Sequence, residues 1–395
     1  MSTIKPPDFP FRSADGFSHP PLLTELRERR PVSKVRMPTG DEAWLVTNYD
    51  DVRFVLADSR FSAAATTDPD VPHLSPMYDM PRTMLTMDPP EHTRLRKLVA
   101  GEFTVRRVEA LRPRVAELTE RALDRLEEQG QPGDLHAHLA QILPINVICE
   151  LLGVPYEDWP MFRRLSDSIL SLTGRPVSEM REARDELLAY MARLVAAKRS
   201  APGDDLLSAL AATPDSRISE AELVAVGAFT LAAGYESTVS QIGMAILALL
   251  HDRSQYAALV ADPELLGTAV EELLRVAGPG AGAFLRIATD DVEISGVKIR
   301  AREAVLAAVG SANRDETVFE DAARLDITRR SCPHIAFGHG VHHCLGAALV
   351  RLEFEAVLSA LTRRFPGLSL AVPIGDIPWR TGSRLFGVLA LPVQW

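Results

Sequence analysis

Cys344 is the residue whose surroundings point most directly to chemistry. It lies in the run FGHGVHHCLG, residues 337–346, which leads into an apolar segment, residues 347–361, with helical spacing. The free N–H groups and the dipole at the start of that helix are expected to favour the ionised thiol. A thiolate held there could act as a nucleophile, as a metal ligand or as the axial ligand of a haem iron.

A zinc site is the first alternative, because histidines lie beside the cysteine. His339, His342 and His343 precede Cys344, but no further cysteine or histidine pair stands at Cys-x-x-Cys or His-x-x-x-His spacing. The glycines on both sides of the cysteine allow the backbone to approach a bound group closely. The sequence therefore disfavours a structural zinc site, and it equally disfavours a cysteine that merely fills space in the core.

A long apolar segment, residues 223–250, carries the second set of candidates. Ala233 and Gly234 precede Ser237 by four and three positions, so these residues share one face of a helix. Small residues there would let a flat body lie against the helix, although they also suit a helix–helix crossing. A hydroxyl on that face can bend the helix and hold water. Glu236 in the middle argues against a membrane span, so we expect a helix buried in a soluble protein.

Two charged pairs at helical spacing complete the candidates. His92 and Arg96 follow a Pro-Pro dipeptide that is expected to start a helix, and they project from one side of it. Glu272 and Arg275 stand at i, i+3 spacing and can form an ion pair. Taken alone, either pair would be read as a solvated surface contact.

Helices are expected to dominate the elements that position these residues. The apolar periodicity predicts helices over residues 111–129, 135–152, 158–172, 177–199, 220–250, 262–276 and 347–365. Strands are predicted over residues 43–47 and 305–309, as a hairpin over 291–299, and as a last pair within 385–393. Residues 62–88 and 310–333 are irregular and rich in turn residues. Because neither linker nor repeat interrupts the pattern, residues 1–395 are expected to form a single domain.

Composition narrows the class of protein. The chain has 395 residues, 46% of them hydrophobic, and a formal net charge of −10, so nucleic acid is not expected as a partner. Its three cysteines form no disulfide framework, and the N-terminus has no apolar signal core. We therefore expect a soluble cytoplasmic protein that does not bind a membrane.

These motifs, taken in order, resemble the cytochrome P-450 superfamily. The Cys344 run matches the haem-ligand loop of that family, Glu272-x-x-Arg275 its buried pair, and AGYEST, residues 233–238, its oxygen-binding segment. The resemblance covers about residues 88–392. It implies a mainly α fold, a triangular helical prism with a small β-rich region. Haem b would lie between the long central helix and the helix after the Cys loop.

The resemblance also implies roles for individual residues. Cys344 would be the metal ligand of the haem iron, and Arg324 or Arg329 would complete the Glu272–Arg275 network. The expected haem contacts are His92, Arg96, Ala233, Arg286, Phe337, His342 and Cys344. The expected catalytic residues are Gly234, Glu236 and Ser237, with serine at a position where the family usually has threonine. That departure removes the methyl group that restricts the rotamer of the hydroxyl-bearing side chain.

The implied activity is that of a haem-thiolate monooxygenase, which hydroxylates or epoxidises a bulky small molecule with O2. The residues 278–283 are small and leave room near the haem, which favours a secondary metabolite such as a macrolide, polyketide or cyclic peptide. The expected pocket residues are Phe229, Ala233, Ala283, Phe284, Leu385 and Phe386. A ferredoxin and its NAD(P)H-dependent reductase are expected to supply electrons, with docking at Arg94, Lys97, Arg106 and Arg107.

Three alternatives stay open at this point. The chain could couple two aromatic groups without inserting oxygen, which the serine at position 237 makes less remote. It could bind haem without turnover, although a passive binder needs no acid such as Glu236 beside the site. It could also be a zinc-binding structural protein.

Overall fold

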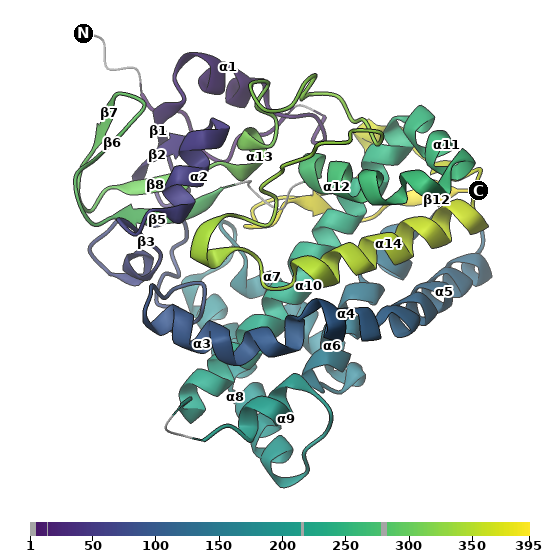
Figure 1. Ribbon diagram of the computed structural model, residues 1–395, viewed down its shortest axis with the longest axis horizontal. Coiled ribbons are helices and arrows are strands. Elements are labelled where there is room, and N and C mark those ends of the chain that lie inside the picture. The colour runs from purple at the N-terminus through teal and green to yellow at the C-terminus, as the bar shows by residue number, and fades with distance from the viewer. Residues whose placement is uncertain (1–4, 14, 215–216, 278–282) are drawn as a thin grey trace.

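The computed structural model describes residues 5–13, 15–214, 217–277 and 283–395, and helices make up most of it (Figure 1). The helices are α1 Pro21–Arg29, α2 Tyr49–Ala57, α3 Glu91–Val99, α4 Val105–Ala110, α5 Arg112–Gln129, α6 Ile142–Leu152, α7 Trp159–Ile169, α8 Val177–Ser200, α9 Leu206–Ala211, α10 Glu220–His251, α11 Arg253–Ala261, α12 Leu266–Val276, α13 Val309–Ala312 and α14 Ala347–Arg364. The strands are β1 Val32–Arg36, β2 Glu42–Val46, β3 Phe61–Ser62, β4 Gly133–Asp134, β5 Phe284–Ala288, β6 Val292–Ile294, β7 Val297–Ile299, β8 Ala304–Ala307, β9 Ser369–Leu370, β10 Trp379–Arg380, β11 Gly387–Val388 and β12 Pro392–Gln394.

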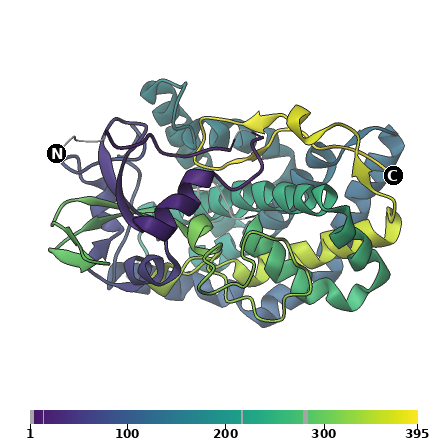
Figure 2. The same ribbon diagram turned by 90° about the horizontal axis from the view of Figure 1, so that it is seen from above.

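A small mixed sheet lies at one end of the molecule and the helices fill the rest (Figures 1 and 2). Its strand order is β1-β2-β8-β5-β3, and only the β2–β8 pair is parallel. The parallel pair is possible because the chain travels through most of the helical part before it returns as β8. This arrangement matches the mainly α architecture with a small β region that the sequence predicted.

Helix α10 is the central element, and its sequence explains why. It is 32 residues long and begins at a capping box in which Ser219 and Glu222 each bond the other's backbone N–H. It packs against α6, α8 and the one-turn π-helix His136–Ala140, so most of its surface is buried. The helix is long and apolar enough to cross a membrane, yet 72% of its most apolar window is buried inside the protein. The predicted buried helix of a globular protein is therefore what the structure contains.

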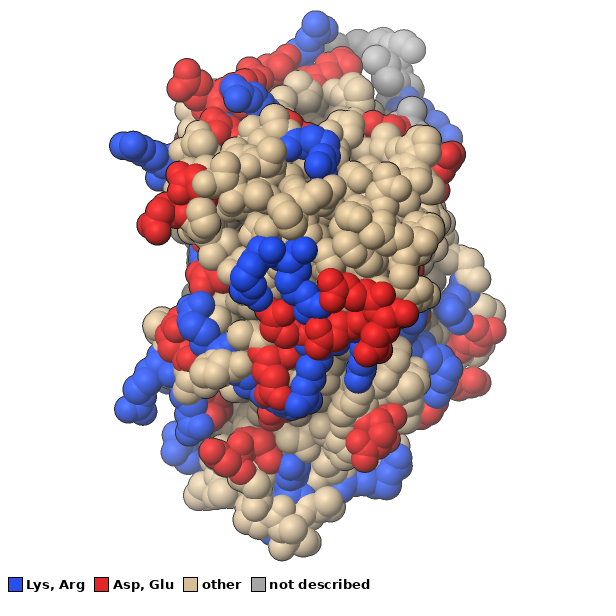
Figure 3. All heavy atoms as spheres, turned by 90° about the vertical axis from the view of Figure 1, so that its right-hand side faces the viewer, with Lys and Arg blue, Asp and Glu red and all other residues tan. Residues whose placement is uncertain are grey.

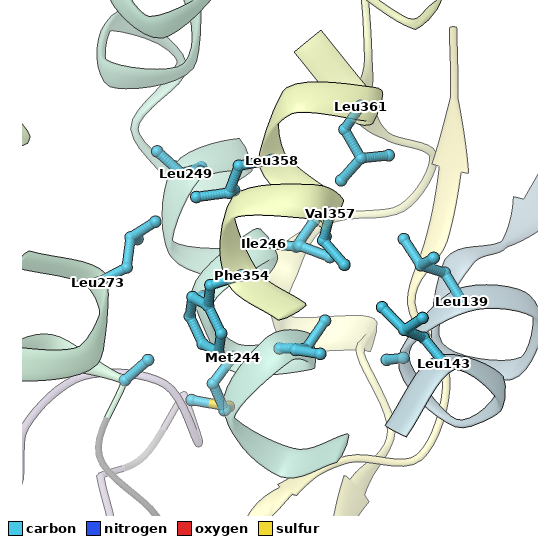
Figure 4. Close-up of a cluster of buried hydrophobic side chains, with 14 of the residues drawn as sticks. Leu139, Leu143, Met244, Ile246, Leu249, Leu273, Phe354, Val357, Leu358 and Leu361 are labelled. Carbon is cyan, nitrogen blue, oxygen red and sulfur yellow. The ribbon is translucent and has the colours of Figure 1, made fainter. Parts of the chain in front are cut away.

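The largest apolar cluster joins α10 to α12 and α14. Met244, Ile246 and Leu249 of α10 point toward Phe354 and Leu358 of α14, as Figure 4 shows. Each of these residues is less than a tenth exposed, so the helices around the Cys loop are held by close apolar packing. A truncation from leucine to alanine in such a core costs about 2–5 kcal/mol.

The pair Glu272–Arg275 is fully buried and is bonded on all sides. Arg275 donates to both carboxylate oxygens of Glu272 at 2.7 Å, and its remaining N–H groups bond the carbonyls of Asn313, Ala322 and Arg324. Arg329 adds a 3.0 Å bond to the same carboxylate. The structure thus settles which arginine completes the pair, since Arg324 contributes only its backbone oxygen.

Most predicted elements are present, and they differ from the predictions in a few bounds and in how the last strands pair. The predicted helix 135–152 is divided into the π-helix and α6, and the predicted strand 305–309 ends at Ala307. The tail strands β11 and β12 do not pair with each other, because β11 joins β10 while β12 joins β4 and β9. The hairpin of β6 and β7 turns at Ser295 and Gly296, both with positive φ, as predicted.

Charged side chains of both signs alternate on the end of the molecule where α5 and α14 run (Figure 3). Arg364 contacts Glu120, Asp124 and Glu127 of α5, and Arg363 also pairs with Glu120. Because these charges neutralise one another, this face has no single-sign field that would attract a polyanion.

Candidate active site

The loop that carries Cys344 has a backbone shape that its glycines permit. Gly338 and Gly340 have φ of +75° and +71°, and a Cβ on Gly340 would lie 2.6 Å from the carbonyl oxygen of Leu56 in α2. The N–H of Cys344 bonds the carbonyl of Phe337 at 2.8 Å, which closes the loop on itself. The loop therefore approaches α2 at a distance that only glycine allows, and this contact fixes the position of the thiol.

The thiol of Cys344 is less acidic than the sequence predicted. Burial raises its pKa, while the N–H of Gly346 and the guanidinium groups of Arg96 and Arg351 act in the opposite direction. Helix α14 begins only at Ala347, so the helix terminus contributes little more than that one N–H. Burial of Cys344 therefore opposes the ionised thiol that the helix terminus was expected to favour. A cation bound to the sulfur would favour the thiolate.

A second ion-pair group braces this loop, and sequence reasoning missed it. Glu271 accepts from Arg351 at 2.6 and 2.9 Å and contacts His334 at 3.1 Å. Burial opposes ionisation of Glu271, yet these two partners hold its pKa at about 2. The guanidinium of Arg351 also lies 4.7 Å from the ring centre of Phe337. Glu271 is next to Glu272, which the sequence analysis selected, but only the contacts of Glu271 with Arg351 and His334 show that it braces the Cys344 loop.

One face of α10 is open while the rest of the helix is covered. Ala233 is exposed and Phe229 and Ser237 are partly exposed, whereas Tyr235 and Glu236 are buried. These three open positions repeat at four-residue steps and form one stripe, which α6 and α8 do not cover. The loop bearing Cys344 runs beside the middle of α10 in both views of the ribbon (Figures 1 and 2). Ala233 and Ser237, the small residues that the sequence predicted to face haem, therefore lie on an uncovered part of α10.

Gly234 has a different task from its neighbours in the motif. A Cβ at this position would lie 2.7 Å from the side chain of Ile148 in α6. Its lack of a side chain thus serves the crossing of α10 and α6. The helix–helix crossing that the sequence left open is therefore present at Gly234, and the contact of Ala233 with haem stays a prediction.

The hydroxyl groups of Ser237 and Thr238 donate hydrogen bonds to backbone carbonyls in the preceding turn of α10. Ser237 Oγ donates to the carbonyl of Ala233 at 2.7 Å, and Thr238 Oγ1 donates to that of Gly234 at 3.1 Å. Thr238 is buried, so Ser237 is the hydroxyl that borders the open stripe. Its oxygen keeps acceptor capacity for a further donor such as water.

Glu236 is fully buried and is joined to the surface through a short chain of charges. Its Oε2 accepts from Arg380 at 2.6 Å, and Arg380 also contacts Asp167, whose side chain is 35% exposed. Burial raises the pKa of Glu236, although Arg380 opposes that rise. Its Oε1 has no hydrogen-bond partner among the described residues. This acid can therefore hold a proton and still offer one free oxygen.

The expected propionate contacts form a cluster in which donors outnumber the acceptors that the described residues offer. Both ring nitrogens of His92 are buried without a partner in the described part of the chain, and its ring lies 4.4 Å from that of His342. Arg286 is 7% exposed and bonds only the carbonyl of Leu285, with Asp88 as the nearby carboxylate. Burial lowers the pKa of His342 to about 4. Buried donors without acceptors are the chemistry that two propionates would satisfy, so these residues fit haem.

Arg96 links this cluster to the Cys loop. Its Nη2 donates to the carbonyl of His343 at 2.6 Å, next to Cys344 in the chain. Burial lowers the pKa of Arg96, while the nearby thiol of Cys344 opposes that change. Among the described residues no group of three or more His, Cys, Asp and Glu side chains is placed to hold a metal ion, which removes support for zinc.

The expected pocket residues differ in how much they face open space. Phe284 is 36% exposed, and Phe229, Ala283 and Leu385 are partly exposed. Phe386 instead stacks on Trp379 with ring centres 5.2 Å apart. The small residues 278–282, which favoured a bulky substrate, lie outside the described part of the chain.

The close approach of Gly340 to α2 makes a testable prediction. Gly340→Ala should lower the free energy of unfolding by about 1–2 kcal/mol, and the urea midpoint with it, because alanine resists positive φ and its Cβ meets the Leu56 carbonyl. The control is Gly267→Ala in α12, where a Cβ meets nothing within 4 Å and alanine should leave stability equal or higher. Equal midpoints for the two variants would contradict this account of the loop.

Comparisons with known proteins agree with this geometry. The family model described as "Cytochrome P450" matches residues 21–157 and 257–369. The chain is 47% identical over 390 residues to nocardicin C N-oxygenase of Nocardia uniformis subsp. tsuyamanensis, covering 98% of each protein. It is 45% identical to mycinamicin IV hydroxylase/epoxidase of Micromonospora griseorubida, covering 100% of each.

Solved structures show the same relationship. HinD, crystallised with NMFT and NO, has a TM-score of 0.94 and 45% identity, and the match covers 100% of both chains. The mixed-function P450 MycG has a TM-score of 0.90 and 45% identity over 99% of this chain and 100% of its own. The fold, the Cys loop and the relatives agree, and the chain belongs to the cytochrome P450 family of haem b-dependent oxidoreductases.

Proposed function

We propose that this protein is a monooxygenase that hydroxylates or epoxidises a bulky secondary metabolite. Two relatives that match the chain over almost its full length are named as an N-oxygenase of nocardicin C and a hydroxylase/epoxidase of mycinamicin IV. The open stripe of α10 and the exposed side chain of Phe284 support a roomy site. Nocardicin C and mycinamicin IV are therefore the first compounds to test as ligands.

The residues around the site have separable roles. Haem held by a cysteine thiolate supplies the chemistry that cleaves the O–O bond of O2. Cys344 would be its ligand, Ala233 and Phe337 would border its two faces, and the His92 and Arg286 cluster would bind its propionates. The protein orients the substrate and keeps bulk water out.

The single observation that carries the proposal is the placement of Cys344. The close approach of Gly340 to α2, the contact of Arg351 with Phe337 and the bond from Arg96 to the His343 carbonyl hold the loop that carries this thiol. A thiol in a hydrolase site would require a histidine base within hydrogen-bond reach of the sulfur. Among the described residues, no histidine ring nitrogen forms such a bond with Cys344.

A spectroscopic measurement tests this placement. The purified protein, reduced and exposed to carbon monoxide, should show the strongly red-shifted Soret band of thiolate-ligated haem. Cys344→Ser should lose that band. Cys332→Ser is the matched control, because Cys332 is also a free, partly buried cysteine and contacts Glu272 instead. A band that survives Cys344→Ser, or a protein that takes up no haemin, would overturn the proposal.

Oxygen insertion and oxidative coupling differ in the fate of O2. If the protein inserts oxygen as proposed, product formed under ¹⁸O2 carries the label. Aryl coupling, which the sequence left open, gives unlabelled product.

Glu236 and Ser237 are proposed to deliver the protons that this reaction consumes. Asp167 reaches solvent, Arg380 connects it to Glu236, and the unpartnered Oε1 of Glu236 can pass a proton onward. Ser237 Oγ bonds the Ala233 carbonyl and can accept from a water in the open stripe. The hydroxyl therefore positions water at the end of the route, and the carboxyl supplies the proton.

Removal of this hydroxyl should uncouple electron use from product formation. In Ser237→Ala, haem content and ligand affinity should be unchanged, while hydrogen peroxide released per NAD(P)H should rise several-fold. Ser237→Thr should restore coupling, since it keeps the hydroxyl and adds the methyl group that orders it. Thr238→Val is the control, because Thr238 is buried and bonds only Gly234. An unchanged peroxide yield in Ser237→Ala would refute this role.

We also propose that a ferredoxin, reduced by an NAD(P)H-dependent ferredoxin reductase, supplies the electrons. The expected docking residues are not equally available. Arg94 pairs with Glu222, and Arg107 contacts Glu102. Lys97 and Arg106 are exposed and form no ion pair in the described structure. Exposed Val105 of α4, 69% accessible, and Val341 of the Cys loop, 46% accessible, add apolar area.

Charge reversal at the unpaired residues tests this docking surface. Lys97→Glu combined with Arg106→Glu should slow reduction by ferredoxin at low salt about 10-fold or more and flatten its salt dependence. Reduction by dithionite should stay unchanged. Arg121→Glu on α5 is the control, since it reverses the charge of an exposed arginine elsewhere. Equal rates for the double variant and the control would exclude this surface.

We further propose that residues 1–395 form one catalytic domain that works in the cytoplasm. Strand β12, at the end of the chain, pairs with β4 and β9, which ties the C-terminus to the helical part. All three cysteines are free, as suits a reducing compartment.

A further inference from the structure

The loop between β10 and β11 carries an arginine, Arg384, next to the expected pocket residues Leu385 and Phe386. Trp379 and Arg380 pair with Val388 and Gly387, so residues 381–386 form the loop of a hairpin. The N–H of Arg384 bonds the carbonyl of Leu170 at 2.9 Å, just after α7. On the other side, Ser240 of α10 donates to the carbonyl of Phe386. The loop is thus held between α7 and α10, one helical turn from Ser237.

The guanidinium of Arg384 has no partner. Its side chain forms no hydrogen bond or ion pair within the described residues, and burial lowers its pKa. The residue nevertheless keeps partial exposure, as Leu385 beside it does. Arg384 is therefore neither fully buried nor freely exposed. A buried cation without a partner is costly, so such a group is normally paired.

The other enclosed arginines follow that rule. Arg275 is paired with Glu272, and Arg380 with Glu236 and Asp167. Arg286 has Asp88 nearby, and Arg314 donates to the carbonyl of Val276. Arg384 is the exception in the described structure.

The described carboxylates near the hairpin loop do not pair with this charge. The carboxylates close to α10 and α7, Glu236 and Asp167, are already bound to Arg380. The undescribed residues 278–282 are Gly-Pro-Gly-Ala-Gly and contain no acid. The propionate cluster is separate, because the charges that act on Arg286 and His342 are Asp88, His92 and each other.

We propose that Arg384 binds a carboxylate of the substrate, so that the protein acts on an acid-bearing metabolite, such as one derived from a peptide or amino acid. This inference rests on the proposed function. A guanidinium binds a carboxylate through two parallel hydrogen bonds, which fixes orientation as well as affinity. The acid end would lie at the hairpin loop, and a remote carbon or nitrogen would reach the haem side of Ser237. An uncharged macrolide would leave Arg384 unpaired and bind less well.

Imidazoles with a carboxyalkyl tail test this assignment without knowledge of the substrate. The imidazole nitrogen coordinates haem iron and shifts the Soret band, so every probe gives a measurable Kd. The probes are 1-(ω-carboxyalkyl)imidazoles of increasing chain length and their methyl esters. At the chain length that spans iron and Arg384, the acid should bind about 10- to 100-fold more tightly than its ester.

Variants locate the source of that preference. Arg384→Leu should abolish the preference for the acid, and Arg384→Lys should keep part of it. Arg12→Leu is the matched control. The guanidinium of Arg12 lies 5.3 Å from the ring centre of Phe386, a residue of the same hairpin as Arg384, and this substitution should leave the preference for the acid intact. If Arg384→Leu cannot retain haem, the acid-to-ester ratio of the unaltered protein decides by itself.

The outcomes separate this inference from the proposed function. Equal affinity for acid and ester at every chain length, in a protein with the thiolate spectrum, would overturn the inference alone. A preference for the acid that survives Arg384→Leu would also overturn it. Loss of the thiolate spectrum in the unaltered protein would overturn the proposed function and the inference together.

Discussion

The buried side chain of Arg275 is the interaction on which the position of Cys344 depends. It joins α12 to the irregular segment through the carbonyls of Asn313, Ala322 and Arg324. The side chain of Asn313 then accepts from the N–H of Ile335 at 2.8 Å. An unbroken path of hydrogen bonds thus leads from a helix to the start of the Cys loop.

That path matters because the segment between β8 and α14 has little regular structure to hold it. Its only helices in the described structure are the short α13 and the single turn Gly340–His342. A loop of this length keeps one conformation only if its backbone groups are bonded elsewhere. The Glu272–Arg275 pair supplies those bonds, and removal of one partner from such a pair costs about 3–5 kcal/mol. The ion pair therefore holds the backbone that leads to the Cys344 loop in place, although it does not itself contact the reacting atoms.

The buried charged side chains have different partners, and the partners indicate different functions. Arg275 is neutralised within the protein and serves the fold, whereas Arg380 is neutralised by Glu236 and Asp167 and connects the site to solvent. The ring nitrogens of His92 have no partner among the described residues, Arg286 bonds only the carbonyl of Leu285, and the guanidinium of Arg384 forms no bond there. At His92, a bound propionate would supply the acceptor that the described residues do not.

Much of the fold followed from the chain itself. The capped apolar helix α10, the helix α14 and the glycine run before it depend on residues close together in sequence, so periodicity and caps predicted them. The identity of Arg329 as the third member of the Glu272 network, the pairing of Glu236 with Arg380 across 144 positions, and the isolation of Arg384 required the tertiary structure. The burial that raises the pKa of Cys344 was not foreseen, because a helix terminus is visible in sequence and desolvation is not. Local backbone preferences are encoded within a few residues, whereas the partner and burial of a charge depend on which distant segments the folded chain brings beside it.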